Sequence, residues 1–298
     1  MPIIGILASA ISGNLIPIPV DQWASIASYP VAMSNSMGAA IGNVVYMSGG
    51  NDGSGQVSST YAYDITANSW STKASMPATK SNGSAAAVGN IIYFFAGISA
   101  NVAVATVYAY DTVNNSWSTK TSMPGAWYDT NCAAVGTTIY VMGGYAGGSY
   151  PGGLRDTNYA YDTVGNSWST KTAVPYATYS PVVNSVDGIV YVCGGANGGT
   201  NNNAYDPVAN SWSSKAAMGT DCFSGMMGVI GKTAYAIGGF PPKANNQAYN
   251  TLNNSWSNKA SLPQALYGSG FASTSTKIYI IAGVDSSYSR ITASYVYG

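Results

Sequence analysis

One ten-residue phrase recurs along this chain and constrains its fold more than any other feature. In its second copy it reads YAYDTVNNSW, and the five related copies end at Trp70, Trp117, Trp168, Trp212 and Trp256. A sixth tryptophan, Trp23, opens the series without the upstream phrase. Self-similarity at a regular period indicates a repeat architecture, in which each copy forms one supersecondary unit that packs against its neighbours.

The spacing after each of these tryptophans is constant. A tyrosine follows 23 residues after the tryptophan in all six units, and the second residue of a Gly-Gly or Ala-Gly pair follows 27 residues after it. Only the distance from that glycine to the next tryptophan varies, through 20, 20, 24, 17 and 17 residues. A constant core with one variable segment is typical of a stacked unit with one tolerant loop.

Each unit contains four short runs that are typical of strands. In the second unit they are residues 84–88, 91–96, 106–111 and 117–120, with Gly89-Asn90 as the turn between the first two. Four antiparallel strands repeated six times predict an all-β, six-bladed β-propeller over residues 21–298. The N-terminus supplies a fourth-strand phrase at Asp21-Gln22-Trp23 and the C-terminus the three strands before it, so we expect the two ends to complete one blade and close the ring.

The tryptophan, tyrosine and glycine-pair pattern resembles the kelch repeat at a period near 50 residues, over roughly residues 21–298. The resemblance implies the kelch-type propeller fold, whose members include both enzymes and binding scaffolds. Galactose oxidase also has a kelch propeller, but its copper site needs histidine ligands, and this chain has no histidine. That activity is therefore not expected here.

The charge composition excludes several further functions. The chain has 298 residues, of which 11 are Lys or Arg and 11 are Asp, with no Glu and no His. Catalytic triads that use histidine and histidine-containing metal sites are therefore excluded. A net charge of zero argues against a nucleic-acid partner. We expect no metal, no cofactor and no enzymatic activity, and we interpret Cys132, Cys193 and Cys222 as small buried hydrophobic residues.

The loops on one face of the expected propeller carry the candidate ligand-binding residues. The connection from the second to the third strand and the link from one blade to the next emerge on the same side. In the kelch propellers that bind peptides, the ligand face resembles this one, but the basic residues found there are mostly absent here. Aromatic rings in their place could stack on sugars or apolar groups, with polar neighbours for directional contacts. The candidates are Lys80, Asn82, Trp127, Tyr128, Asp129, Tyr179, Phe223 and Tyr267, together with Arg155 in the longest loop.

Each of these candidates also has a structural interpretation. The rings could pack between neighbouring sheets, and the loop Tyr145–Thr157 could be a glycine-rich connection without a role. Asp129 and Asp221 lie in equivalent links two sheets apart, which leaves a catalytic carboxylate pair open as a weaker alternative. The repeated aspartates and lysines of the units are expected to cap turns and to protect the outer sheet edges.

Residues 1–20 do not match the repeat and are interpreted as an anchoring segment. They carry no charge, lack the basic start of a signal peptide and are too interrupted by glycine and asparagine to span a membrane. The phrase MPIIGILASAISGNL resembles the N-terminus of virion structural proteins from tailed bacteriophages. That resemblance implies attachment to other virion proteins through residues 1–20.

These observations lead to three hypotheses. The first is a non-enzymatic bacteriophage virion protein, in the capsid, tail or fibre, that displays a propeller for adhesion to a host-surface glycan or protein. The second is a secreted kelch propeller that binds or processes carbohydrate. The third is an architectural role in which the propeller decorates a particle without binding a host ligand.

Overall fold

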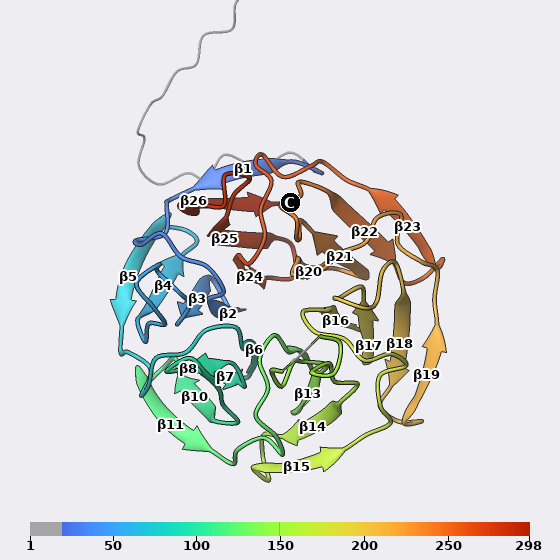
Figure 1. Ribbon diagram of the computed structural model, residues 1–298. Coiled ribbons are helices and arrows are strands. Elements are labelled where there is room, and N and C mark those ends of the chain that lie inside the picture. Colours follow the sequence, from blue (N-terminus) through green and yellow to red (C-terminus); the bar gives the residue numbers. More distant parts are fainter. Residues whose placement is uncertain (1–19, 149) are drawn as a thin grey trace, which may run out of the picture.

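Six four-stranded antiparallel sheets are arranged as blades around a central axis in the computed structural model, which describes residues 20–148 and 150–298 (Figure 1). From the innermost strand outward, blade 1 contains β2 (Met37–Ile41), β3 (Val44–Ser48), β4 (Thr60–Asp64) and β5 (Ser69–Lys73). Blade 2 contains β6 (Ser84–Val88), β7 (Ile91–Phe95), β10 (Val107–Asp111) and β11 (Ser116–Lys120). Blade 3 contains β12 (Asn131–Val135), β13 (Thr138–Met142), β14 (Asn158–Asp162) and β15 (Ser167–Thr170).

The remaining three blades repeat this order. Blade 4 contains β16 (Val182–Val186), β17 (Ile189–Cys193), β18 (Asn202–Asp206) and β19 (Ser211–Ser214). Blade 5 contains β20 (Met226–Ile230), β21 (Thr233–Ile237), β22 (Asn246–Asn250) and β23 (Ser255–Asn258). Blade 6 contains β24 (Gly270–Ser273), β25 (Ile278–Val284), β26 (Arg290–Tyr297) and β1 (Trp23–Ile26). The described residues form no helix, so the predicted all-β propeller is confirmed.

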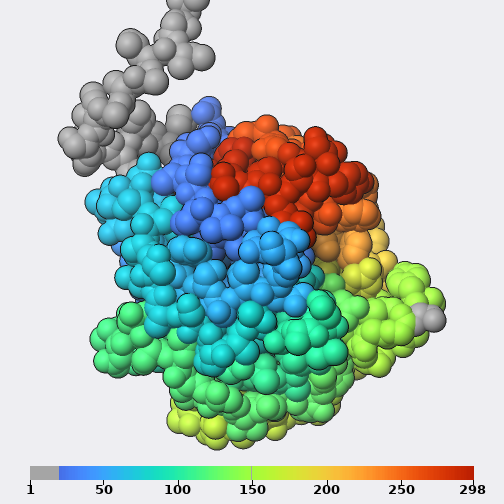
Figure 2. Space-filling model, turned by 60° about the vertical axis from the view of Figure 1, so that its left-hand side comes forward, coloured from blue at the N-terminus to red at the C-terminus, as the bar shows by residue number. Residues whose placement is uncertain are grey.

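The two ends of the chain complete blade 6, as the sequence predicted. The first strand, β1, pairs antiparallel with β26, with Trp23 opposite Tyr297 and Ile26 opposite Ser294. The innermost strands of blades 6 and 1, β24 and β2, lie side by side, so the ring is closed. In the space-filling view the blue N-terminal residues lie directly against the red C-terminal ones (Figure 2).

The repeated tyrosines build the contacts between neighbouring blades. The tyrosine of each second strand lies against the third-strand tyrosine of an adjacent blade. Tyr46 and Tyr110 join blades 1 and 2 with ring centroids 5.8 Å apart, and Tyr235 and Tyr297 join blades 5 and 6 at 5.5 Å. The same pairing recurs at the other four junctions, which are Tyr93–Tyr161, Tyr140–Tyr205, Tyr191–Tyr249 and Tyr279–Tyr63. Pairs of this kind contribute about 0.5–1.5 kcal/mol each beyond their area, so the tyrosine period of the sequence is the period of the blade interfaces.

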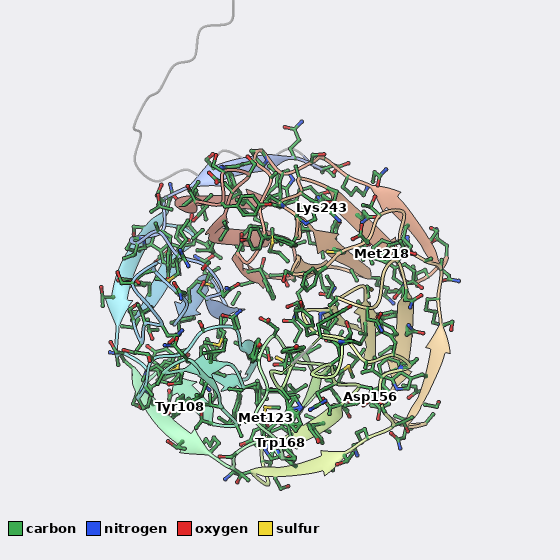
Figure 3. The ribbon with its side chains drawn as sticks, viewed as in Figure 1. Tyr108, Met123, Asp156, Trp168, Met218 and Lys243 are labelled. Atoms are coloured by element: carbon green, nitrogen blue, oxygen red, sulfur yellow. The ribbon has the colours of Figure 1, made fainter. Side chains whose placement is uncertain are left out.

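The repeated tryptophans and asparagines join the blades at the outer rim, where Trp168 lies (Figure 3). In blade 2, Trp117 Nε1 donates to the Ala74 carbonyl of blade 1 at 2.8 Å. Asn115 Oδ1 accepts the Ala74 N–H at 2.9 Å and the Tyr110 hydroxyl at 2.7 Å. We call this arrangement the rim latch. It recurs on all six blades, and in blade 6 the carboxylate of Asp21 takes the place of the asparagine amide.

The repeated aspartates cap turns, as expected. In blade 2, Asp111 Oδ1 accepts the backbone N–H groups of Val113 and Asn114 at 2.9 and 3.0 Å. Asp64, Asp162, Asp206 and Asn250 accept equivalent bonds in the other blades. The three cysteines are buried and unpaired, in agreement with their interpretation as small hydrophobic residues.

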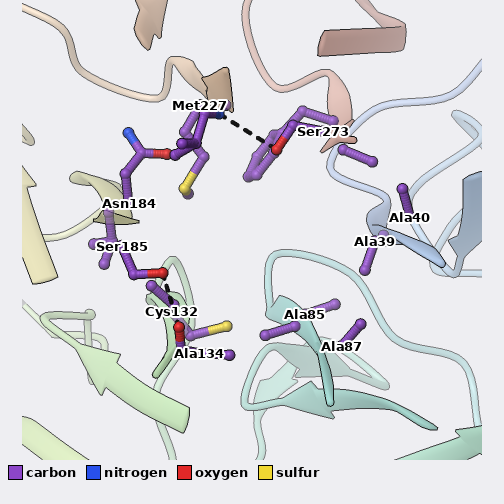
Figure 4. Close-up of a pocket in the computed structure, with 18 residues that line it drawn as sticks. Ala39, Ala40, Ala85, Ala87, Cys132, Ala134, Asn184, Ser185, Met227 and Ser273 are labelled. Carbon is purple, nitrogen blue, oxygen red and sulfur yellow. Dashed lines mark hydrogen bonds between the residues drawn. The ribbon is translucent and has the colours of Figure 1, made fainter. Parts of the chain in front are cut away.

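The innermost strands carry small side chains because the six blades converge on the axis. Residues such as Ala39, Ala85, Ala134 and Ser185 surround a central channel with a cavity of about 300 Å³ (Figure 4). At Gly38, Gly228 and Gly270, a Cβ atom would lie within 2.6 Å of a neighbouring side chain. Glycine at these three positions therefore leaves room for Met47 and Ile278 of the second strands, which pack next to the channel.

Candidate ligand-binding face

One face of the ring is built from two kinds of loop that pair with each other. Tyr128, in the link between blades 2 and 3, forms a backbone bridge with Tyr145 in the loop between the second and third strands of blade 3. Tyr267 and Val284 form the equivalent bridge at blade 6. These contacts confirm that the two sets of connections share one face, which we call the upper face.

The Gly-Gly and Ala-Gly pairs of the repeat bind the links of this face to the blades through backbone hydrogen bonds. The first residue of each pair has a φ of 55–66°, and the second has a φ of 85–120°. The second residue's N–H donates to the first residue of a neighbouring link, as from Gly144 to the Thr178 carbonyl at 2.8 Å. At Gly49 a Cβ atom would lie 2.2 Å from the Lys80 carbonyl oxygen. Positive φ and close backbone approach together explain the small residues of the repeat.

The last residues of the six links form a closed backbone ring around the channel mouth. Each has a φ between 47° and 57° and donates its N–H to the carbonyl of the equivalent residue in the preceding link. The distances range from 2.6 Å for Asn35 to Gly268 up to 3.3 Å for Ser224 to Ser180. The members of this mouth ring are Asn35, Asn82, Asp129, Ser180, Ser224 and Gly268. Asn, Asp, Ser and Gly suit this left-handed conformation and present polar groups at the mouth.

The side chains of the mouth ring enclose a cavity of about 60 Å³ above the channel. Asn82 Nδ2 donates to Asp129 Oδ1 at 2.8 Å. Burial raises the pKa of the Asp129 carboxyl to about 6, and the bond from Asn82 opposes this rise. Phe271 of β24 lines both this cavity and the channel beneath it. The mouth is therefore a small polar chamber with one carboxylate.

Aromatic rings surround more than half of the mouth. They follow one another at centroid distances of 5.0–6.5 Å, beginning with Tyr128 on Tyr145 at 5.5 Å and ending with Tyr267 on Tyr288 at 6.4 Å. We call this set the aromatic arc, and its members are Tyr128, Tyr145, Tyr179, Phe223, Phe240, Tyr267 and Tyr288. Phe240 and Tyr288 are 38% and 61% exposed, and the four link residues are half-buried.

The arc is confined to the links that lead into blades 3–6. In the links that lead into blades 1 and 2, the equivalent residues are Ser34 and Ser81, and both are buried. Arg290 reaches across this side, where its Nε donates to Ser34 Oγ at 3.1 Å and to the Asn51 carbonyl at 3.0 Å. The upper face thus has an aromatic side and a polar side, which a perfectly repeated sequence could not produce.

Of the predicted site residues, Lys80 lies inside the protein and Trp127 is half-buried against Tyr159 of blade 3. Lys80 is fully buried, its Nζ donates to the Thr106 carbonyl at 2.8 Å, and it lies 4.8 Å from the Tyr108 ring centroid. Burial lowers the pKa of its ammonium group to about 7. Trp127 packs edge-on to Tyr159 at 5.9 Å and its Nε1 is buried without a partner. These two side chains occupy the first position of their links, where the residues of the other four links are buried, namely Met33, Thr178, Cys222 and Leu266.

The other predicted residues lie on the upper face in two separate groups. Asn82 and Asp129 belong to the mouth ring, and Tyr128, Tyr179, Phe223 and Tyr267 belong to the aromatic arc. Arg155 does not reach either group, because its Nη1 donates to the Leu154 and Gly152 carbonyls of its own loop at 2.9 and 3.3 Å.

The carboxylates of Asp129 and Asp221 do not share a cavity. Asp129 lines the channel mouth, while the exposed Asp221 forms an ion pair with Lys243 at 2.8 Å. The catalytic pair that the spacing left open is therefore not assembled at the mouth.

Sequence reasoning missed three groups of this face. Phe240 and Tyr288 of the arc come from loops between second and third strands, and the position of Phe240 directly after its glycine pair, like that of Tyr145, was a usable signal. Ser36 lines the mouth and lies one residue beyond its ring. The recurrence of Asn, Asp, Ser or Gly as the last link residue was the signal for the ring itself.

Within residues 20–148 and 150–298, no group of three or more His, Cys, Asp or Glu side chains is placed to hold a metal ion. None of the elements formed by these residues is a helix able to cross a membrane.

Comparisons with known proteins agree with this architecture. The model of the KLHDC2/KLHL20/DRC7 Kelch-repeats domain family matches residues 39–239. Among solved structures, one titled "Structure of YjhT" superimposes with a TM-score of 0.78 at 17% sequence identity, covering 90% of this chain and 95% of the other. No curated protein sequence matches the chain.

Proposed function

Since the chain belongs to the Kelch-repeats domain family, we propose that it is a non-enzymatic binding propeller, which attaches a bacteriophage virion to a glycan or protein on the host surface. The upper face is the binding surface in this proposal. Residues 1–20 link the propeller to other virion proteins.

The aromatic arc is the observation that carries the binding role. Seven rings gather on one face, and their centroids lie close enough to form one continuous surface around a polar mouth. Rings that present a partly exposed face beside directional polar groups suit the apolar face of a sugar or an aromatic or aliphatic side chain. The same positions on blades 1 and 2 carry buried serines, so the arc is not a requirement of the fold.

The virion role rests on the sequence. Its support is the resemblance of MPIIGILASAISGNL to the opening of tailed-phage structural proteins, and a charged fraction of only 7%. A surface of so little charge is less of a handicap on a large particle than on a free monomer. Residues 1–19 lie outside the described part of the structure.

Binding through the arc is tested on a glycan array with the full chain. We expect the wild type to bind a subset of glycans, and Tyr179→Ala and Tyr267→Ala each to weaken that binding about tenfold or more, because each removes a ring that contacts two others of the arc. Val208→Ala is the control, since this 97% exposed side chain lies in a turn between third and fourth strands, away from the upper face. Thermal unfolding identifies any variant that fails to fold.

Two results would contradict the binding proposal. One is wild-type protein that binds neither a glycan nor a host-surface protein. The other is binding that survives in the folded Tyr179→Ala and Tyr267→Ala variants.

The anchoring role is tested by deletion of residues 2–20. We expect a folded propeller that is absent from purified particles, because the deletion ends before Asp21 and leaves the rim latch and β1 intact. Immunoblots of particles assembled with the deleted and the full-length protein measure incorporation. Normal incorporation of the deleted protein would overturn the anchoring role.

A secreted propeller that processes carbohydrate is the second candidate, and one observation favours it. The pKa of Asp129, at about 6, lies in the range of a general acid. Glycoside hydrolysis ordinarily needs a second carboxylate, and Asp221 is paired with Lys243 instead. Turnover of a bound glycan that is abolished by Asp129→Asn would favour this candidate over the first.

A further inference from the structure

Asp129 carries a charge that the surrounding protein does not balance. Its Oδ1 accepts one hydrogen bond from Asn82. The ion pairs found in the described residues join Lys232 to Asp187, Lys243 to Asp221 and Lys259 to Asp21, and none of them includes Asp129. Lys80 lies in the neighbouring link, but its ammonium is directed to the Thr106 carbonyl. Asp129 is half-buried, and a carboxylate partly withdrawn from water without a counter-ion is costly unless a partner supplies the charge.

A second polar group of the mouth also lacks a partner. Ser36 is 7% exposed, and its Oγ is buried without a hydrogen-bond partner while it lines the same cavity as Asp129. Buried polar groups in native structures are nearly always paired. Ser180 and Ser224 of the mouth ring add two further hydroxyl oxygens to the cavity wall. One negative charge and several hydroxyl acceptors therefore surround a chamber of about 60 Å³.

We propose that the channel mouth binds one primary ammonium group, carried by an amino sugar or by a lysine side chain, with Asp129 as its counter-ion. The hydroxyl of Ser36 and that of either Ser180 or Ser224 accept the two remaining N–H bonds of that group. The inference rests on the proposed binding function, because the aromatic arc holds the rest of the ligand.

The geometry favours an ammonium group over a guanidinium. Asn82 occupies one oxygen of the Asp129 carboxylate, so the bidentate contact that arginine prefers is incomplete. An ammonium group is a compact donor of three hydrogen bonds and fits a small chamber lined with single oxygens.

The arrangement also favours an organic cation over a metal ion. Tyr128, Tyr179 and Phe223 directly precede three residues of the mouth ring. Tyr128 and Tyr179 lie near enough to Asp129 that its charge, after burial, raises their pKa values. Aromatic faces next to a cation site can hold the body of the ligand and add a cation–π attraction.

Calorimetric titration of the full chain at pH 7.5 tests the inference with two pairs of probes. One pair is the glucosamine trimer and the N-acetylglucosamine trimer, and the other is a lysine-containing hexapeptide and its acetyl-lysine form. We expect one of the two amine probes to bind at least tenfold more tightly than its acetylated partner. Asp129→Asn should remove that preference, because it keeps the shape of the side chain and removes its charge.

Two further variants complete the design. Ser36→Ala should weaken amine binding several-fold and leave the acetylated probes unaffected. Asp156→Asn is the charge-matched control on an upper-face loop, since its exposed carboxylate is not part of the mouth, and it should change nothing. The Asp129→Asn protein is expected to fold, because Asn35 and Asn82 occupy equivalent positions of the mouth ring.

The pH dependence of binding gives an independent readout. Amine affinity should rise between pH 5 and pH 7, as Asp129 loses its proton near a pKa of about 6, and should be flat in Asp129→Asn. Tyr128 and Tyr179 face this carboxylate, and their pKa values are raised above 10, so they stay neutral in this window. Lys80 titrates near pH 7, and the Asp129→Asn variant retains it, so a pH dependence that persists in this variant would be assigned to Lys80 and would overturn the inference.

Other outcomes separate this inference from the proposed function. If an acetylated probe binds as well as its amine form and depends on Tyr179, the ammonium site is wrong and the binding face stands. If an amine probe binds Asp129→Asn as tightly as the wild type, the ammonium site is also wrong. If no probe, no glycan and no host-surface protein binds the wild type, both proposals fail together.

Discussion

At the scale of single residues, the repeat encodes contacts between blades more than contacts within them. Each asparagine of the rim latch has a φ near 50° and accepts one bond from its own blade and one from a neighbour. Each tryptophan donates to the same neighbouring residue. The regular spacing of these residues was visible in the sequence, but their hydrogen bonds to the neighbouring blade were not predictable. The cross-blade partner of each lies about 40 residues away in the chain.

The rim latch of Asn115 makes a measurable contribution to stability. Asn115→Ala should lower the free energy of unfolding by about 2–3 kcal/mol, through two lost hydrogen bonds and a left-handed backbone that alanine disfavours. Asn115→Asp should lose less than about 1 kcal/mol, because it keeps the acceptor, as Asp21 does in blade 6. Denaturant unfolding of both variants, with the exposed Thr119→Ala as the control, measures this difference. Equal losses of unfolding free energy in the two Asn115 variants would show that the hydrogen bonds accepted by this side chain do not stabilise the protein.

At the scale of elements, the strands were predictable and the loops only partly so. In blade 2 the four predicted strands agree with β6, β7, β10 and β11 to within one residue. Alternation of side chains and two-residue turns are local signals, so they survive in a single sequence. The short hairpin of β8 (Ile98–Ser99) and β9 (Val102–Ala103) lies in a variable loop and was not predicted.

The candidate site, too, was predictable only in part. The face and its aromatic character followed from strand alternation, but which link residues point outward did not. Lys80 was expected on the surface and is buried, and Trp127 is half-buried with its Nε1 enclosed, because the first position of the links packs against the blades. The mouth ring depends on hydrogen bonds between six links that are far apart in the sequence. No local sequence pattern indicates that these links come together.

At the scale of the whole molecule, the ring is held closed by noncovalent contacts. They lie at one seam in blade 6, where β1 pairs with β26. Asp21 Oδ1 accepts the Tyr297 hydroxyl at 2.6 Å and the Ala260 N–H at 3.0 Å, with Lys259 Nζ 3.9 Å from the other carboxylate oxygen. The Tyr297 bond, followed by those of Ala260 and Lys259, lowers the pKa of this carboxyl against an opposing effect of burial. The seam therefore contains an ionisable group where the other five junctions have a neutral amide.

This difference predicts how closure responds to acid. Because the pKa of Asp21 is lowered on folding, its contribution is fully present above the unfolded pKa of about 3.9 and is lost as the pH falls through the folded value. The free energy of unfolding should thus fall more between pH 5 and pH 2.5 in the wild type than in Asp21→Asn. Denaturant unfolding across this range measures both. Parallel pH profiles would mean that the seam does not respond to the charge of Asp21.

The pairing of β1 with β26 also has a consequence for synthesis on the ribosome. Residues 23–26 leave the ribosome early, but their partners at 294–297 are made more than 260 residues later. At about 5–20 residues per second, roughly 15–50 s separate the two events. During that interval the residues of β1 lack their partner strand. The ring can therefore close only after β26 has left the ribosome, so closure is a late and long-range step of folding.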